Sequence, residues 1–152
     1  MITVSAHAIA NAFITLSEAQ RRPLTNMQVQ KLVFLAHGYT LGLYDRPLYF
    51  DNTHAWQWGP VTPKLYKSLQ KFGSGFVTSK VPSQDFVPGE DREAWSVIEA
   101  VWQGYGHRSG GQLSALTHKN GSPWEQIWNK ERFSIIPTET IGAYYRGLVE
   151  TV

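Results

Sequence analysis

The chain has 152 residues, no cysteine, 42% hydrophobic residues and a formal charge of +2. This length suits one compact domain, so residues 1–152 are predicted to form a single domain. Without cysteine there are no disulfides, thiolate nucleophiles or sulfur-bound zinc, which fits a reducing cytoplasm. The charge is far below the basic excess that a phosphate backbone requires, so nucleic acid is not an expected partner.

Neither export nor membrane insertion is predicted. The N-terminal segment lacks a basic region, and His7 and Asn11 interrupt its apolar residues. Nowhere do about eighteen apolar residues follow one another, as a membrane-spanning helix requires. We therefore expect a cytoplasmic protein with no membrane partner. Six Trp, seven Tyr and seven Phe supply large side chains that serve cores and interfaces alike.

Two helices are predicted in the N-terminal third. Residues 6–16 carry apolar side chains at helical spacing after Thr3 or Ser5, either of which suits the N-cap. Thr25 and Gln28 then form a capping box that opens a second helix through residue 43. This second helix is apolar on more than one side, so it is predicted to be the central helix of the fold.

A small β element is predicted next. Leu48-Tyr49-Phe50 is a short β-prone run, and residues 54–58 alternate as an extended segment does, so two short strands or one hairpin would fit. Gly59-Pro60 is expected to halt the extended segment. Thr62 is then predicted to cap a third helix that has Pro63 at its first position and continues to about residue 72.

The C-terminal half is predicted to be helical after a long loop. Residues 73–89 are rich in Gly, Ser and Pro and are expected to form a loop that Phe76, Val77 and Val81 attach to the body. Helices are predicted over residues 95–105, closed by Gly104 and Gly106, over 109–116, from Ser122-Pro123 through 128, and over 141–148. The fold class is therefore mainly α, with about six or seven helices and a hairpin near the middle.

No catalytic or metal-binding pattern stands out among the residues. The five histidines, His7, His37, His54, His107 and His118, share no metal-ligand spacing, and His37, His54 and His118 are each expected to be structural. No serine-nucleophile or phosphate-binding glycine motif occurs. The acids near residue 91 suit a helix start. An enzyme and a bound cofactor are therefore not expected, although an undetected enzyme acting on a protein or a small molecule stays as an alternative.

The segment Trp56-Gln57-Trp58-Gly59-Pro60 is the most conspicuous local feature. Two indoles of an extended segment would point to the same face, and a Gly-Pro pair would turn the chain away. A plug in the core is the favoured interpretation over an exposed anchor. Nevertheless, interface hot spots are rich in Trp and Tyr, so the aromatic surplus favours a binding module over a catalyst.

An ordered series of sequence blocks resembles the Panacea domain family. The blocks are Gln30 through Gly38, Pro47-Leu48-Tyr49-Phe50, Ala55 through Val61, Leu65-Tyr66, Tyr105-Gly106, Ser109 through Leu116, Thr117-His118 and Pro123-Trp124. The resemblance covers roughly residues 25–128. The family motif residues, which either contact a partner or specify the fold, are Lys31, Tyr39, Trp56, Trp58, Gly59, Pro60, His118, Pro123 and Trp124.

The resemblance implies an antitoxin of a bacterial or prophage toxin–antitoxin system. Members of this family block many unrelated protein toxins by direct contact, so the implied partner is a cognate toxin. The SocA-like members are instead described as adaptors that deliver the toxin to the ClpXP protease, which is the second implied function. Some relatives carry an added DNA-binding part, for which this chain has no evident segment.

Overall fold

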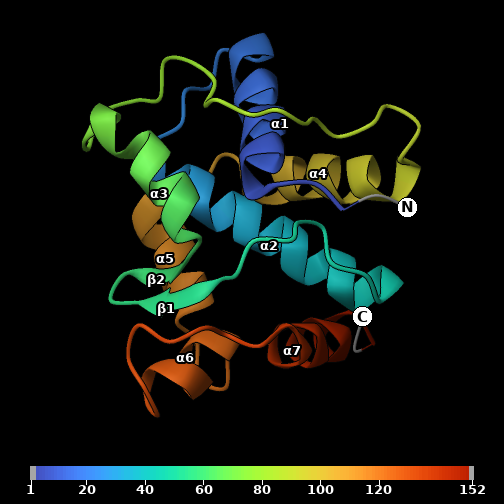
Figure 1. The fold of residues 1–152 in the computed structure, drawn as a ribbon, viewed down its shortest axis with the longest axis vertical. Helices are drawn as coiled ribbons and strands as arrows, with labels where there is room; N and C mark the ends of the chain where they lie inside the picture. The colour runs from blue at the N-terminus through green and yellow to red at the C-terminus, as the bar shows by residue number, and fades with distance from the viewer. Residues whose placement is uncertain (1–2, 151–152) are drawn as a thin grey trace.

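Residues 3–150 are described by a computed structural model, in which the predicted mainly α fold is confirmed. Within these residues the chain forms seven α-helices, one short 3-10 helix and one β-hairpin (Figure 1). The elements are α1 Ala6–Ala19, α2 Asn26–Tyr44, β1 His54–Trp56, β2 Gly59–Val61, α3 Pro63–Leu69, η1 Gln70–Phe72, α4 Arg92–Tyr105, α5 Gly110–Thr117, α6 Pro123–Trp128 and α7 Thr138–Glu150.

The second helix is the central element, as predicted. It begins at the predicted capping box, where Thr25 accepts from the backbone of Gln28 and the Gln28 side chain accepts from Thr25 N. Figure 1 shows α2 crossing the middle of the molecule, and it packs against α1, α4, α5 and α7. Because it has neighbours on so many sides, nearly all of its residues from Val29 to Leu41 are buried.

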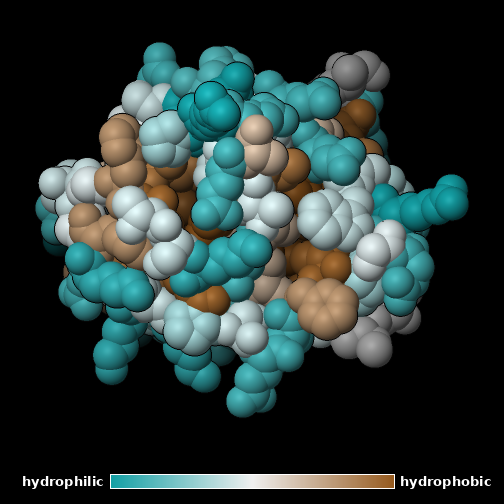
Figure 2. All heavy atoms as spheres, turned by 90° about the horizontal axis from the view of Figure 1, so that it is seen from above, coloured by the Kyte–Doolittle hydropathy of each residue, from teal (hydrophilic) through white to brown (hydrophobic). Residues whose placement is uncertain are grey.

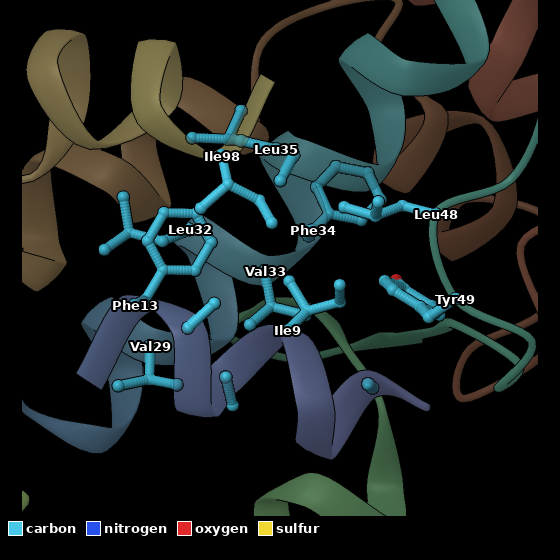
Figure 3. Packing of buried hydrophobic residues seen from close by; sticks show 14 of the residues in the cluster. Ile9, Phe13, Val29, Leu32, Val33, Phe34, Leu35, Leu48, Tyr49 and Ile98 are labelled. Atoms are coloured by element: carbon cyan, nitrogen blue, oxygen red, sulfur yellow. The ribbon is translucent and has the colours of Figure 1, made fainter. Parts of the chain in front are cut away.

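The core fills the space between α2 and the helices on either side of it. In Figure 3, Ile9 and Phe13 of α1 point toward Val33 and Leu32 of α2, and Ile98 of α4 approaches Leu35. A buried aliphatic or aromatic side chain contributes about 1.5–3 kcal/mol when it leaves water. The same hydrophobic cluster includes residues from Val4 to Tyr145, so segments near both ends of the described chain contribute to one core together with α2.

One face of α2 carries glycines that let α7 come very close. A Cβ on Gly38 would lie 2.5 Å from the Tyr145 ring, and one on Gly42 would lie 2.8 Å from the Tyr145 backbone. Tyr39 stands beside them and meets the Tyr145 ring edge-on at 4.9 Å. It also shares a hydrogen bond of 3.1 Å with the hydroxyl of Tyr105 on α4. This face therefore joins three helices tightly.

The β element differs from its prediction in position. Leu48-Tyr49-Phe50 forms no strand, since Tyr49 makes only an isolated bridge with Val4. The hairpin instead lies entirely within residues 54–61, with Trp56 paired to Gly59. Gly59-Pro60 therefore begins the second strand and does not halt the first. The left-handed φ of Gly59, +120°, lets the chain turn back after only two residues.

Other predicted boundaries need smaller corrections. Ser5 is the N-cap of α1, and Gly106 follows the last residue of α4 while Gly104 lies inside that helix. Thr62 occupies the N-cap position of α3, but its side chain makes no capping hydrogen bond. The long loop has no helix or strand, with Val77 and Val81 buried as predicted, whereas Phe76 is exposed and attaches through its backbone.

Candidate functional site

The hairpin loop holds a tryptophan by its backbone and leaves its side chain in solvent. Gln57 and Trp58 form the two-residue loop between β1 and β2. The Trp58 carbonyl accepts a hydrogen bond of 3.0 Å from the Ser114 hydroxyl on α5. The Trp58 residue nevertheless has 63% of its surface exposed. The prediction of a core plug is therefore wrong for Trp58. Because the chain turns after Trp56, the two indoles do not lie on one strand and are not held on the same face.

Trp56 is half-buried and connects the hairpin to α3 and α6. Its ring meets the Tyr66 ring edge-on at 5.3 Å. Its carbonyl accepts a short hydrogen bond of 2.6 Å from the Trp124 indole nitrogen. His118 lies perpendicular to Trp124 at 4.0 Å between ring centroids. Pro123 is buried at the first position of α6, where it helps to place Trp124.

Lys31 lies beneath the hairpin and is almost fully buried. Its Nζ donates to the Pro60 carbonyl at 3.3 Å. Burial lowers the pKa of Lys31 from 10.5 to about 7, because the charged amine loses hydration. A Cβ on Gly59 would come within 2.9 Å of the Lys31 Cε and Nζ atoms. Lys31, Gly59 and Pro60 therefore form one interlocked unit.

A cavity of about 400 Å³ opens beside this unit. Its walls come from the start of α2, from the hairpin and from α3 with the turn that follows. The lining residues are Thr25, Asn26, Met27, Gln30, Lys31, Trp56, Trp58, Val61, Tyr66, Gly73, Ser74 and Gly110. The cavity thus combines an apolar, aromatic wall with a few polar groups, which is the usual composition of a binding pocket.

Gln30, which lines this cavity, has an unsatisfied polar atom. Its Nε2 donates to Asn26 Oδ1 at 3.3 Å, but its buried Oε1 has no hydrogen-bond partner. A buried acceptor without a donor costs about 1–3 kcal/mol of stability. Such an atom is unusual in a folded protein, and here it belongs to a residue that lines a cavity.

The motif residues divide into three groups. Lys31, Trp56 and Trp58 line the cavity, and Gly59 and Pro60 shape it from the hairpin. His118, Pro123 and Trp124 support the hairpin from α5 and α6. Tyr39 lies about 12 Å further along α2 than Lys31, given the rise of 1.5 Å per residue. It belongs to the contact between α2, α4 and α7, so it does not join the other motif residues.

A row of aromatic rings continues from the support of the hairpin to the surface. The Trp124 and Trp128 rings are stacked at 5.5 Å, and Phe133 meets Trp128 edge-on at 5.3 Å. Arg132 stands over the Trp128 ring at 5.0 Å. Phe133 is exposed and has a positive φ of 66°. These contacts stiffen the segment behind β1, on which the hairpin rests.

His37, His54 and His118 are held in structural contacts, as predicted. His37 Nδ1 accepts from Leu48 N at 3.2 Å, and burial lowers the pKa of His37 to about 3, which keeps the ring neutral. His54 Nδ1 contacts the Phe133 carbonyl at 3.2 Å, and His118 Nδ1 contacts the Ser114 carbonyl at 2.6 Å. Among residues 3–150, no three His, Asp or Glu side chains are grouped to hold a metal ion.

Among the lining residues outside the predicted set of motif residues, three supply a large side chain or a buried polar group: Met27, Gln30 and Tyr66. Gln30 and Tyr66 lie within sequence blocks that carry the family resemblance, and that proximity to Lys31 and Trp56 was the available signal. The sequence gives no such signal for Met27, because a methionine in the first turn of a helix is typical of an ordinary surface position. Its position beside the hairpin depends on how α2 packs against α5, where a Cβ on Gly110 would touch it at 3.1 Å.

The chain belongs to a family of antitoxins. Residues 29–125 match the family described as "Antitoxin SocA-like, Panacea domain", close to the span predicted from the sequence blocks. The chain is similar to Antitoxin SocA of Caulobacter vibrioides (strain NA1000 / CB15N). The two are 32% identical over 135 residues, which cover 84% of this chain and 72% of the relative. No solved structure matches it. In residues 3–150 no helix is both long and apolar enough to span a membrane.

Proposed function

We propose that this protein neutralises a cognate protein toxin by binding it directly through the hairpin face. We use that name for Met27, Trp56, Trp58, Tyr66 and the cavity between them. The observation that carries the proposal is the position of Trp58, which is fixed through its backbone and exposed through its ring at the rim of a cavity. Membership of an antitoxin family supplies the class of partner.

The physical properties of this face suit a tight protein contact. Interface hot spots are enriched in Trp and Tyr, and a rigidly held anchor loses little conformational freedom when it binds. Figure 2, which shows the molecule from above, has hydrophobic residues in separate patches among polar ones, as most folded proteins do.

The composition of the chain bears on its cellular compartment and on the class of its partner. A chain with a formal charge of +2 and no cysteine suits a cytoplasmic antitoxin that contacts protein, not nucleic acid or membrane. We propose that residues 1–152 act as one domain, that the gene belongs to a toxin–antitoxin pair of the kind carried by prophages, and that protection requires no catalysis and no cofactor.

The test is co-expression with the open reading frame beside the gene. Growth rescue and co-purification of the two products are expected for the unaltered chain. Trp58→Ala should weaken the complex by about 30-fold or more, the loss typical of a hot-spot residue. Phe86→Ala, at a more exposed aromatic of the long loop, is the matched control and should leave the complex intact. Equal affinity of the two variants would contradict the proposed face.

The alternative function is delivery of the toxin to ClpXP. We retain it because the chain is similar to Antitoxin SocA. The same co-expression in hosts with and without ClpXP separates the two functions. Rescue in both hosts, with a stable complex, supports neutralisation by binding. Rescue that needs the protease, with binding unchanged, supports the adaptor. A folded His118→Ala variant that still binds the toxin but no longer protects would instead favour an enzyme.

A further inference from the structure

The cavity of the hairpin face contains hydrogen-bonding capacity that the fold does not use. Gln30 Oε1 is buried and has no donor. Lys31 Nζ makes one hydrogen bond, to Pro60, although an amine carries two or three N–H groups. The two residues are adjacent on α2 and line the same cavity. A ligand that pairs with both groups must therefore both donate and accept.

The rest of the cavity wall selects an apolar group. Trp56 and Tyr66 form an edge-on pair, and Met27 and Trp58 lie at more exposed positions around them. Aromatic rings and a flexible thioether adapt well to a large aliphatic or aromatic side chain. The volume of about 400 Å³ is at the small end of ligand pockets and is on the scale of one or two residues.

A peptide segment meets these requirements better than an anion does. Lys31 is the one charged side chain among the lining residues, whereas phosphate sites commonly gather several cations or backbone N–H groups. The free Gln30 oxygen would also repel an anion. An extended peptide instead presents a C=O and an N–H at every residue, together with a side chain that leaves the backbone at right angles.

We propose that this cavity binds a short extended segment of a partner polypeptide. Lys31 donates to a backbone carbonyl of the segment, Gln30 Oε1 accepts a backbone N–H, and the adjoining large apolar side chain packs among Trp56, Trp58 and Tyr66. The inference rests on the proposed function to the extent that the segment belongs to the toxin. It adds the chemistry by which the hairpin face recognises that toxin.

The decisive variant is Gln30→Met, which keeps the size of the side chain and removes its polar end. Because the unsatisfied acceptor and the long 3.3 Å hydrogen bond from Nε2 to Asn26 disappear together, their effects offset and the midpoint temperature of unfolding should stay nearly equal. Because the acceptor for the segment also disappears, affinity for the toxin should fall about tenfold. Gln103→Met, at an exposed position of α4, is the matched control and should change neither quantity.

A second measurement does not depend on the toxin. N-acetyl-tryptophanamide and N-acetyl-leucinamide carry two amide groups beside one large apolar side chain, and we titrate them into the full chain while following its indole and side-chain amide NMR signals. The Trp56, Trp58 and Gln30 signals should shift on binding, and the response should weaken in Gln30→Met. Acetate, used as the anionic probe, should not reproduce these shifts.

The two measurements distinguish failure of this inference from failure of the proposed function. A toxin complex that forms normally with Gln30→Met, together with blocked amides that shift no cavity signal, overturns the peptide site and leaves the antitoxin role intact. Blocked amides that bind the cavity without any toxin complex support the peptide site and contradict the proposed function. A Gln30→Met variant that loses stability and affinity together, or acetate that shifts the same signals, also overturns the inference.

Discussion

The two ends of α2 differ in how completely their side chains are packed and hydrogen-bonded. Toward α7, Gly38 and Gly42 remove side chains so that Tyr145 can pack directly on the helix, and the Tyr39 hydroxyl finds its partner in Tyr105. Toward the hairpin, the same helix buries Gln30 and Lys31 beside an open cavity and leaves a carbonyl oxygen without a donor. The first end has the features of a finished core contact, and the second has those of a binding site. The proposed binding site is therefore placed at the end of α2 where packing and hydrogen bonding are incomplete.

The largest expected effect is that of Gly59→Ala at the hairpin end. A side chain there meets both a positive φ of 120° and the Lys31 amine at 2.9 Å. Backbone strain and crowding together should lower the free energy of unfolding by about 2–5 kcal/mol. Urea unfolding measures this loss. A variant as stable as the unaltered chain would show that the hairpin and Lys31 are not interlocked.

Gly38→Ala should have the next largest effect, at the α7 end. Its Cβ would lie 2.5 Å from the Tyr145 ring, which is itself buried, so a loss of about 3 kcal/mol is expected from overpacking. The folded fraction of the variant should still bind the toxin with unchanged affinity, as calorimetry with the purified partner would measure. A loss of affinity in folded protein would break the division between the two ends of α2.

Lys31 should make stability depend on pH. Its pKa is about 7 in the folded chain and near 10.5 when unfolded, so the unfolded chain binds more protons between these values. Stability therefore rises with pH across this window, by about 2 kcal/mol between pH 7 and 9, since one proton accounts for about 1.4 kcal/mol per pH unit.

Lys31→Met is the matched control for that pH dependence, and denaturant unfolding at several pH values measures it. The variant should lose the rise between pH 7 and 9. The buried tyrosines, whose pKa values are raised, act in the opposite direction and only at higher pH. An unchanged slope in the variant would mean that the Lys31 amine is hydrated in solution.

The smallest expected effect is an increase in stability, for Gly147→Ala. Gly147 lies on the exposed side of α7, and a Cβ there meets nothing within 4 Å. Gly147→Ala should therefore stabilise the chain by about 0.5–1 kcal/mol, because alanine loses less backbone freedom in a helix. Thermal unfolding measures the gain. Loss of stability would mean that α7 frays at this position or packs differently.

The helices were predictable from sequence because their signals are local. The capping box of Thr25 and Gln28 and the Ser-Pro start of α6 involve residues only three apart, and both appear where predicted. The order of family blocks also anticipated the class of protein. The predicted strand at Leu48-Tyr49-Phe50 did not form because Tyr49 instead bridges Val4, ahead of α1, and stacks on His37. Only the tertiary structure decides between these arrangements.

The candidate site was harder to predict because it depends on contacts between distant segments. Trp58 looked like a core residue in an extended segment, yet its exposure follows from a turn that Gly59 makes possible. Gln30 lies in the buried part of α2, and its lack of a hydrogen-bond partner becomes visible only when the hairpin and α3 are in place. Burial of Lys31 similarly requires the Pro60 carbonyl from 29 residues further along the chain.

The long loop between η1 and α4 has a consequence for how this chain can vary in length. Asn11 of α1 brackets Val81, accepting from its N–H at 2.8 Å and donating to its carbonyl at 2.9 Å, as a neighbouring β-strand would. Ser5 fixes Asp85 a few residues later. On either side of Val81, residues 78–80 and 82–84 have exposed side chains. Insertions there would lengthen only the spans between attachments, so α1 and the hairpin face would keep their positions while this surface diversified.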